Sequence, residues 1–519
     1  MSHLAPVLML QGTASDVGKS LLVTALCRAF AREGRRVAPF KAQNMSLNAY
    51  VTPGGEEIGS AQGYQAEAAG VVPSAQMNPL LIKPMPGAAA QLIVGGRAAG
   101  PYDYRRVRSA RGEHASLVAA SLLALRQQHD LVIAEGAGSC AEINLREWDL
   151  ANMHVAELSD AAVLLVGDID KGGVYASLLG TLALLSDADR RHVRGFLINK
   201  FRGDPAGLAP ANTELETRSG LPLLGVVPFL RAHGLPEEDG ASLEAAGRAP
   251  RGGVDDVEIA VVRTPALSNF DELRALADEP GVVLRYIDNA RDAHGADLVV
   301  LAGSRATKAD LAWLRERGFE HALRARAQRG ELTLGICGGC QMLAERIDDP
   351  DGVEGPAGSE PGLGLLPIVV RFEREKRTAR VTGRGTHPLL GQAPLEGYFI
   401  HHGRAEPARR GVTPLLTLDG GERDGAAQGA VLGTMVHGLF EAPAARSSAV
   451  AWLRQQRRGG ARSSLREGAT EAGSRTITAA APAPPVTARE ARVAAYDALA
   501  DHVCGALDMA RLRAMVPLS

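Results

Sequence analysis

The sequence has few cysteines, no long apolar run and almost no net charge, and each of these features excludes a class of protein. Its five cysteines are scattered over 519 residues, too dispersed for a fold held by disulfides. No apolar run approaches the roughly 20 residues that span a bilayer, and the N-terminus lacks the basic region of a signal peptide. The net charge of -2 offers no broad cationic field for nucleic acid. We therefore expect a cytoplasmic protein that binds neither membrane nor nucleic acid.

Short apolar runs alternate with longer stretches of helical period, which is typical of a mainly parallel sheet flanked by helices. A chain of this length is expected to form two to four domains of about 100–200 residues each. The runs fall into two series. Strands of the first series are expected at 7–10, 131–134, 163–166 and 196–198, and strands of the second at 258–262, 282–286, 298–301 and 332–336.

Composition divides the chain further. A first α/β domain is expected over 1–232, and a stretch rich in Gly, Pro and charge at 233–256 reads as a linker to a second α/β domain over 257–455. Residues 456–487 are poor in bulky apolar side chains, which predicts a disordered insertion. The closing segment, 488–519, has helical period and is expected to pack on the second domain.

A phosphate-binding turn is predicted near the N-terminus. The segment VLMLQGTASDVGKSLL at 7–22 reads as a strand, a glycine-rich turn and a helix. Backbone N–H groups of such a turn, with the positive end of the helix behind them, cradle phosphate oxygens. Lys19 would reach the outer phosphates and Ser20 would ligate Mg²⁺. Five residues rather than four separate the two glycines, so the strict Walker spacing is absent. The predicted ATP-binding residues here are Gly12, Thr13, Gly18, Lys19 and Ser20.

Two further polar residues follow expected strands. Glu135 comes directly after the strand at 131–134, where a carboxylate can hold Mg²⁺ opposite the phosphate loop. Taken alone it would read as a surface residue of a Gly-rich turn, but together with Lys19 it favours a metal ligand. Asn199 closes the strand at 196–198, and its amide is a candidate to bind the adenine edge of ATP.

The stretch 41–60, KAQNMSLNAYVTPGGEEIGS, is polar and Gly-rich and follows an expected strand. Ligands bind at the carboxyl ends of the strands in such folds, so the stretch is a candidate substrate loop, with Lys41, Gln43 and Asn44 as contact residues. The alternative is a solvated loop without function.

A thiol nucleophile is predicted in the second domain. LTLGICGGCQM at 332–342 places Cys337 between glycines at a strand-to-helix turn, the arrangement of a nucleophile elbow. The helix N-terminus favours the thiolate. Cys337 and Cys340 also form a CxxC pair, but no further zinc ligands lie nearby. A redox pair stays open as a weaker alternative, because Cys340 falls inside the expected helix and is expected to pack in the core.

The nucleophile needs a base and an oxyanion hole. His437, in VLGTMVHGLF, follows an expected strand about a hundred residues downstream and is the best candidate base, with His401 and His402 as competitors. The N–H groups of Gly338 and Gly303 are candidate oxyanion donors. One domain thus binds a nucleotide and the other forms a thioester, a combination that glutamine hydrolysis coupled to ATP-driven carboxylate activation explains.

The chain resembles a known family in these same residues. Segments 12–20, 135–138 and 199–200 resemble the dethiobiotin synthetase-like ATP fold, and Cys337 with His437 resembles the class I, or triad-type, glutamine amidotransferases. Their combination resembles the cobyric acid synthase and cobyrinic acid a,c-diamide synthase group. Several long strings favour the cobyric acid synthases, namely those at 38–49, 141–153, 168–185, 198–204 and 335–343.

The resemblance implies a fold and a reaction. The fold would be α/β with two domains, a P-loop-type mainly parallel sheet followed by a class I glutamine amidotransferase-like domain. The reaction would amidate the b, d, e and g carboxylates of the corrinoid adenosylcobyrinic acid a,c-diamide, with ATP, Mg²⁺ and glutamine. Cys337 would be the glutaminase nucleophile, His437 its base, Lys19 and Ser20 the ATP-phosphate residues and Glu135 the Mg²⁺ ligand.

One departure and three alternatives accompany this prediction. Most triad-type amidotransferases have an acid two residues after the histidine, but this chain has Leu439 there, so another group must orient His437. The closest alternative is the a,c-diamide synthase, which uses the same chemistry on different carboxylates. The others are a regulatory ATPase with a degenerate amidotransferase tail and a thiol hydrolase under nucleotide control.

Overall fold

The computed structural model describes residues 4–84, 90–102, 109–230, 235, 253, 256–392, 394–459 and 488–517. It forms two compact units: the first comprises Met1–Pro84, Ala88–Glu238 and Arg492–Ser519, and the second Met85–Gly87 and Asp239–Ala491. Most of the predicted linker and of the predicted insertion lies outside the described residues. Residues 456–459 of that insertion form the end of helix α14 (Pro443–Gly459). In the described part of the chain, no helix is long and apolar enough to cross a membrane.

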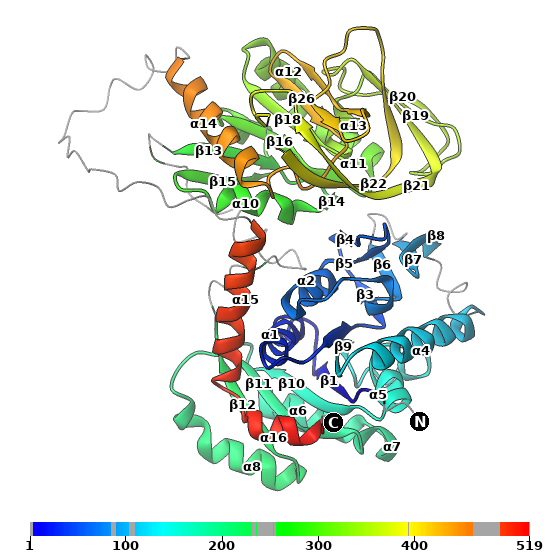
Figure 1. Cartoon of the computed structure of the whole chain (residues 1–519), viewed down its shortest axis with the longest axis vertical. Helices are drawn as coiled ribbons and strands as arrows, with labels where there is room; N and C mark the ends of the chain where they lie inside the picture. The colour runs from blue at the N-terminus through cyan, green and yellow to red at the C-terminus, as the bar shows by residue number, and fades with distance from the viewer. Residues whose placement is uncertain are drawn as a thin grey trace, which may run out of the picture. The chain divides into compact units, whose positions relative to one another are not determined.

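The first unit is built on a six-stranded, wholly parallel sheet (Figure 1). Both faces of its central strand are buried: Met9 belongs to one apolar cluster, and Leu8 and Leu10 belong to the other. This explains why its strands read as continuous apolar runs. In spatial order the strands are β12 (Leu223–Pro228), β11 (Val193–Phe201), β10 (Ala162–Asp168), β1 (Val7–Gly12), β9 (Leu131–Ser139) and β2 (Val37–Phe40).

Helices and two small separate sheets accompany this sheet. The four-stranded sheet β3-β6-β7-β8 and the pair β4-β5 consist of strands of three to six residues that the sequence pattern did not predict. The main helices are α1 (Lys19–Arg32), α2 (Ser60–Ala69), α4 (Arg111–Gln128), α5 (Met153–Ser159), α6 (Val174–Leu184), α7 (Asp187–Arg190) and α8 (Ala209–Ser219). The small strands are β3 (Gln43–Met45), β4 (Ala49–Val51), β5 (Glu57–Gly59), β6 (Leu80–Pro84), β7 (Ala90–Val94) and β8 (Arg97–Tyr102).

The second unit has its own six-stranded sheet, parallel except for the edge strand β25. The four expected strands of the second series are all present. In spatial order the strands are β15 (Val282–Ile287), β13 (Val257–Val262), β16 (Leu298–Leu301), β18 (Leu332–Ile336), β26 (Val431–Thr434) and β25 (Ala426–Gln428). Its main helices are α10 (Arg274–Ala277), α11 (Thr307–Glu316), α12 (Phe319–Gln328), α13 (Gly338–Leu343) and α14.

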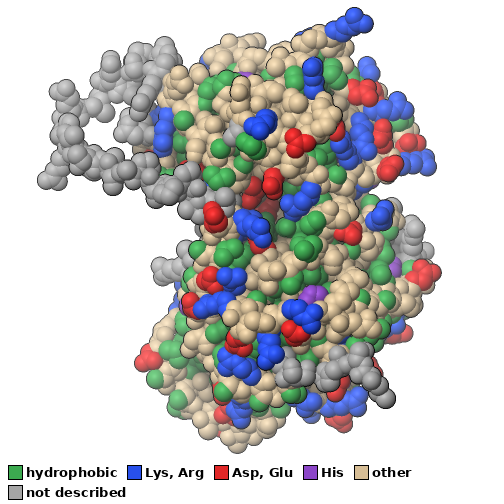
Figure 2. Space-filling view, viewed as in Figure 1, with side chains coloured by type: hydrophobic (Ala, Val, Ile, Leu, Met, Phe, Trp, Pro, Cys, Tyr) green, Lys and Arg blue, Asp and Glu red, His purple; other side chains and the backbone are tan. Residues whose placement is uncertain are grey.

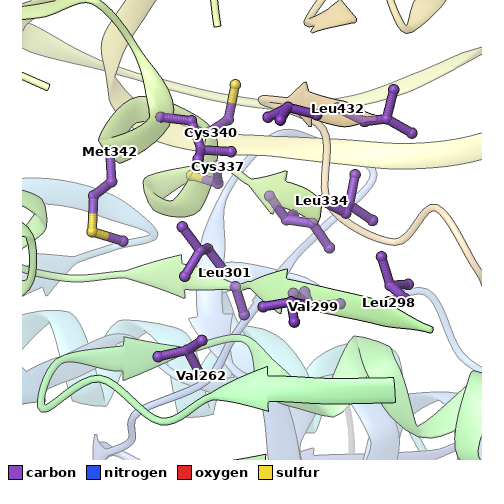
Figure 3. Packing of buried hydrophobic residues seen from close by; sticks show 14 of the residues in the cluster. Val262, Leu298, Val299, Leu301, Leu334, Cys337, Cys340, Met342 and Leu432 are labelled. Carbon is purple, nitrogen blue, oxygen red and sulfur yellow. The ribbon is translucent and has the colours of Figure 1, made fainter. Parts of the chain in front are cut away.

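A second sheet lies beside this core, dominated by a hairpin of β21 (Ile368–Gly385) and β22 (Pro394–Pro407). Its remaining strands are β19 (Arg346–Asp349), β20 (Gly358–Pro361), β23 (Leu416–Leu418) and β24 (Arg423–Asp424). The two-stranded ribbon of β14 (Leu267–Ser268) and β17 (Gly303–Ser304) joins segments that are far apart in sequence. Figure 3 shows the apolar packing around β18, with Leu334 and Leu432 near the turn that carries Cys337 and Cys340.

The predicted position of the C-terminal helical segment was wrong. Helix α15 (Ala488–Cys504) contributes Tyr496, Leu499 and Val503, and helix α16 (Met509–Met515) contributes Leu512, to an apolar cluster of the first unit, not the second. Arg28 of α1 forms a salt bridge with Asp497 of α15 at 2.8 Å. The helical period correctly predicted an amphipathic helix, but period alone does not tell which of two cores receives its apolar face.

The surface agrees with the near-zero net charge. On the face that Figure 2 shows, Lys and Arg side chains are interspersed with Asp and Glu side chains. Many exposed charges are paired, such as Arg36 with Asp130 at 2.7 Å and Arg377 with Glu422 at 2.6 Å.

Candidate active sites

The predicted phosphate loop connects β1 to α1 in the first unit. Gly18 precedes the helix with a φ of 92°, a left-handed conformation that favours glycine. A Cβ at this position would collide with the Asn199 side chain. The Asn199 amide nitrogen donates to the Val17 carbonyl oxygen at 2.8 Å, so Asn199 braces the loop. Its role toward adenine stays a prediction.

Lys19 reaches back across this loop. Its Nζ atom donates to the carbonyl oxygens of Ala14 at 3.1 Å and Gly138 at 3.0 Å. Burial lowers the pKa of Lys19. A Cβ on Gly12 would lie 2.7 Å from this ammonium group, and the Thr13 N–H donates to the Val166 carbonyl at 3.0 Å. Backbone carbonyl oxygens therefore hold the Lys19 ammonium against the loop, and its role toward phosphate stays a prediction.

Glu135 is the centre of a buried polar cluster. Its Oε1 atom accepts hydrogen bonds from Ser20 Oγ at 2.8 Å and Lys41 Nζ at 2.8 Å, and its Oε2 atom accepts one from Gln65 Nε2 at 2.9 Å. Burial alone would raise the pKa of Glu135, but Lys41, Gln65 and Lys19 hold it below its usual range. The structure thus unites three residues that the sequence predicted separately and adds Gln65.

The donor set of this cluster fits magnesium. Two oxygen ligands at right angles on Mg²⁺, each about 2.0–2.1 Å from the ion, lie roughly 2.9 Å apart. Ser20 Oγ and Glu135 Oε1 are 2.8 Å apart, the separation of two such neighbouring ligands. Among the described residues no group of three or more His, Cys, Asp or Glu is arranged to hold a metal. Mg²⁺ usually takes only one or two protein carboxylates beside water and phosphate.

The segment 41–60 is not a solvated loop, which removes that alternative. Lys41, Asn44 and Glu57 are 6%, 2% and 1% exposed, and Gln43 pairs with Leu80 between β3 and β6. The Asn44 amide donates to Gln62 Oε1 at 2.9 Å. Only Lys41 of the three predicted contact residues touches the Glu135 cluster in a described hydrogen bond or ion pair; the contacts of Gln43 and Asn44 with substrate stay predictions.

The predicted nucleophile elbow is present in the second unit. Cys337 lies between β18 and α13 with a φ of 50° and a ψ of -108°, a strained backbone conformation for a non-glycine residue. Its side chain is 5% exposed. Cys340 lies within α13, is fully buried in the core and has a pKa raised well above the usual value by burial. The prediction that Cys340 serves packing is confirmed.

His437 is the histidine that the structure brings to Cys337. The Cys337 side chain lies close enough to raise the pKa of the His437 ring, and this ring stacks on Tyr398 at 5.1 Å between ring centroids and 14° between planes. His401 is a poor base, because burial and the charge of Arg404 lower its pKa to about 3. His402 Nδ1 instead lies 3.1 Å from the Glu373 carbonyl oxygen.

The acidic partner of His437 is Glu272, which sequence reasoning missed. Its Oε1 atom lies 2.7 Å from His437 Nδ1, and its Oε2 atom accepts the Gly438 N–H at 2.7 Å. Burial alone would lower the pKa of His437, but the charges of Glu272 and Cys337 raise it to about 10. Glu272 lies 165 residues before the histidine, so no local motif in the sequence links the two residues. The only sequence signal is the acidic pair Asp271 and Glu272 between two apolar residues, and it is weak.

The two oxyanion candidates lie close to the nucleophile. Gly338 is the first residue of α13, so its N–H has no acceptor within the helix. A Cβ at Gly338 would lie 2.6 Å from the Ser304 nitrogen, and one at Gly303 would lie 3.0 Å from His437 Cε1. The backbone of 303–304 therefore packs directly against the elbow, as an oxyanion loop must.

The interpretations of Cys337 and Cys340 as a zinc site or a redox pair find no support in the described part of the chain. All five cysteines are free thiols, and no cluster of potential metal ligands includes Cys337. Placement in a helix and full burial make Cys340 a poor resolving thiol.

Comparison with known proteins finds a matching family model for most of each α/β unit. Residues 8–240 match the CobQ/CobB/MinD/ParA nucleotide binding domain, and residues 258–445 match the CobB/CobQ-like glutamine amidotransferase domain. The chain is 46% identical to a cobyric acid synthase of Sorangium cellulosum over 99% of both chains. It belongs to the cobyric acid synthase family.

Two more cobyric acid synthases are similar over most of their length. The Chloroflexus aurantiacus protein is 45% identical over 98% of both chains, and the Desulforudis audaxviator protein is 48% identical over 87% of this chain and 91% of its own. Membership of the cobyric acid synthase family confirms the predicted enzyme class, with its nucleotide-binding and glutamine amidotransferase domains in the predicted order.

Proposed function

We propose that this member of the cobyric acid synthase family amidates the b, d, e and g carboxylates of adenosylcobyrinic acid a,c-diamide, giving adenosylcobyric acid. The observation that carries the proposal is the presence, in one chain, of a phosphate loop joined to a buried acidic cluster and of a Cys–His pair in a second unit. Either site alone would fit many enzymes. Together they fit ATP-driven amidation with glutamine as the nitrogen source.

The second unit would release ammonia. The Cys337 thiol gives its proton to His437, and the sulfur attacks the δ-carbonyl carbon of glutamine. The N–H groups of Gly338 and Gly303 stabilise the oxyanion. The carbon–nitrogen bond then breaks as His437 returns the proton to the leaving ammonia. Water, deprotonated by His437, hydrolyses the thioester to glutamate and restores the thiol.

The first unit would use that ammonia. A corrinoid carboxylate oxygen attacks the γ-phosphorus of ATP, ADP leaves, and ammonia displaces phosphate from the acyl phosphate to form the amide. Lys19 and the N–H groups of the loop at 12–20 would hold the phosphates. Ser20 and Glu135 would hold Mg²⁺, which supplies charge neutralisation on the phosphates. Lys41 lies beside Glu135, where its ammonium can attract the substrate carboxylate.

Corrinoid mass tests the proposal. The purified protein is incubated with ATP, Mg²⁺, glutamine and either adenosylcobyrinic acid a,c-diamide or cobyrinic acid. Each amidation replaces a hydroxyl by an amino group, so we expect a stepwise mass decrease on the first substrate, one step for each carboxylate. Amidation of cobyrinic acid alone would assign the chain to the a,c-diamide reaction.

The remaining alternatives give different results in the same assay. Nucleotide hydrolysis without glutamine or corrinoid, and without any amide product, would favour a regulatory ATPase. Glutamine hydrolysis that ignores ATP and leaves both corrinoids unchanged would favour a thiol hydrolase under nucleotide control. Either of these two outcomes would contradict the proposal.

A further inference from the structure

The thiol site contains a carboxylate that takes the place of the missing triad acid. Leu439, at the position where most triad-type enzymes have their acid, is fully buried and apolar. Glu272 reaches His437 from a separate segment, the one-turn helix Phe270–Leu273 that follows β14. Its side chain is 4% exposed and 2.7 Å from the ring nitrogen. The carboxylate thus arrives from about 165 residues earlier in the chain instead of from the histidine's own loop.

The contact fixes both the ring and the backbone that carries it. A carboxylate only accepts hydrogen bonds, so His437 Nδ1 must donate to Glu272 Oε1. The second oxygen accepts the N–H of Gly438, the residue that follows the histidine. Nε2 is then the nitrogen left to exchange a proton with Cys337. Tyr398 stacks on one face of the ring, so rotation away from Cys337 is blocked on that side.

We propose that Glu272 is the positioning residue of the glutaminase, completing a Cys337–His437–Glu272 relay in which it fixes the tautomer and orientation of the base. This inference rests on the proposed glutaminase function of Cys337 and His437. The usual triad acid is replaced by one from the one-turn helix Phe270–Leu273, which follows β14. Strand β14 pairs with β17, which carries Gly303, so the carboxylate and the oxyanion loop are neighbours of the same small ribbon.

The surrounding charges predict a pH dependence. The groups that face the His437 ring are Glu272, the Cys337 thiol and the Tyr398 ring, and His401 lies close enough to interact electrostatically. Because its folded pKa of about 10 lies above the ordinary histidine value of 6.5, the imidazolium form is stabilised. That stabilisation is fully present below pH 6.5 and is lost as the pH rises through 10. Removal of the Glu272 carboxylate is expected to lower the pKa of His437, so that the imidazolium form is lost at a lower pH than in the wild-type protein.

The first experiment measures alkylation of Cys337 by iodoacetamide as a function of pH, followed on the Cys337 peptide by mass spectrometry. It compares the full-length protein with its Glu272→Gln and Glu272→Asp variants. An imidazolium next to the sulfur favours the thiolate. We therefore expect Cys337 to be alkylated more slowly at neutral pH in Glu272→Gln than in the wild-type protein, with Glu272→Asp between the two. Alkylation that is unchanged in both variants would overturn the relay.

Activity gives the second measurement. Glu272→Gln is expected to lower the kcat for glutamine hydrolysis on the order of 10²- to 10⁴-fold, with a smaller change in KM, and Glu272→Asp is expected to recover part of it. Ammonia-dependent amidation should be unchanged in both, which shows that the chain is folded. Glu279→Gln, which removes a half-buried carboxylate paired with Arg446, is the matched control and should hydrolyse glutamine normally.

The wild-type protein supplies a readout that needs no variant. In ¹⁵N-labelled protein, we expect the His437 ring to keep the Nδ1 proton and to remain doubly protonated at pH 8. A ring that titrates near the ordinary value of 6.5, or that carries no Nδ1 proton, would overturn the inference even if Glu272→Gln fails to fold. Absence of glutaminase activity in the wild-type protein would contradict the proposed function instead, while the alkylation and ring titrations would still decide the role of Glu272.

Discussion

The two sites differ in how their residues are distributed along the chain. The nucleotide site centres on one contiguous segment, 12–20. Its partner Lys41 directly follows strand β2, and its partner Glu135 lies within the neighbouring strand β9. The thiol site takes Glu272, Gly303, Cys337 and His437 from four separate segments. Carboxyl ends of parallel strands converge on one edge of a sheet, so strand positions alone bring the first set together. They do not bring Glu272 to His437.

This difference explains which features could be predicted. The eight expected strands are present because buried parallel strands read as apolar runs, and Cys337 stood out because its elbow is a local motif. Glu272 follows a two-residue strand of the small ribbon, which has no period to detect. Apolar and polar residues do not alternate regularly along β21, and this strand carries many charges. Its hairpin with β22 was therefore not predicted from the sequence. The C-terminal helices were assigned to the wrong core because their amphipathic pattern fits either.

Among the variants that distinguish the two sites, the largest loss of amidation is expected for a substitution of Lys19. Lys19→Met removes the cation of the phosphate loop, and we expect amidation to fall about 10³-fold or more with either glutamine or ammonia. Alkylation of Cys337 should be unchanged, because that thiol belongs to the other unit. Arg32→Met, which removes an exposed cation from the last turn of the same helix, is the control. An equal loss in the control, or amidation that survives without Lys19, would contradict the nucleotide role.

A smaller but diagnostic loss is expected for Glu135→Gln. The variant removes a Mg²⁺ ligand, so amidation should fall about 10²-fold and the Mg²⁺ concentration for half-maximal rate should rise. Glu157→Gln, on the exposed side of α5, should change neither quantity. An unaltered Mg²⁺ dependence would remove Glu135 from the metal site.

The same carboxylate predicts a stability change with pH. The pKa of Glu135 is held below its usual range, so its ion pair with Lys41 stabilises the fold above pH 4.5 and loses this effect as the pH falls through the lowered pKa. In acid titrations the wild-type protein should therefore lose more stability than Glu135→Gln. Equal losses would show that the pair contributes nothing to the first unit.

Tyr496→Ala tests the revised position of the C-terminal helices. The ring is fully buried in the first unit, and its hydroxyl donates to Glu67 at 3.0 Å. Deleting it is expected to destabilise that unit by about 3–5 kcal/mol, and Tyr496→Phe by about 1 kcal/mol. Hydrogen exchange should accelerate in α1 and β12 and not in β13 or β18. Acceleration confined to the second unit would restore the original prediction.

The smallest expected effect concerns the ring that covers His437. Tyr398→Leu removes the aromatic stack, which is worth about 0.5–1.5 kcal/mol, so glutamine hydrolysis should slow about 2- to 10-fold. Tyr398→Phe keeps the stack and should behave as wild type. A loss in Tyr398→Phe as large as that in Tyr398→Leu would assign the effect to the hydroxyl, and stacking would then play no part in holding the base.

The central claim is that ammonia release and carboxylate amidation use separate sets of side chains, and Cys337→Ala tests it most directly. The measurement is the rate of corrinoid amidation by this variant with glutamine and, in parallel, with free ammonia. We expect a loss of about 10³-fold or more with glutamine and a rate equal to that of the wild-type protein with ammonia. Amidation that continues with glutamine, or that fails with ammonia in a folded variant, would contradict the account.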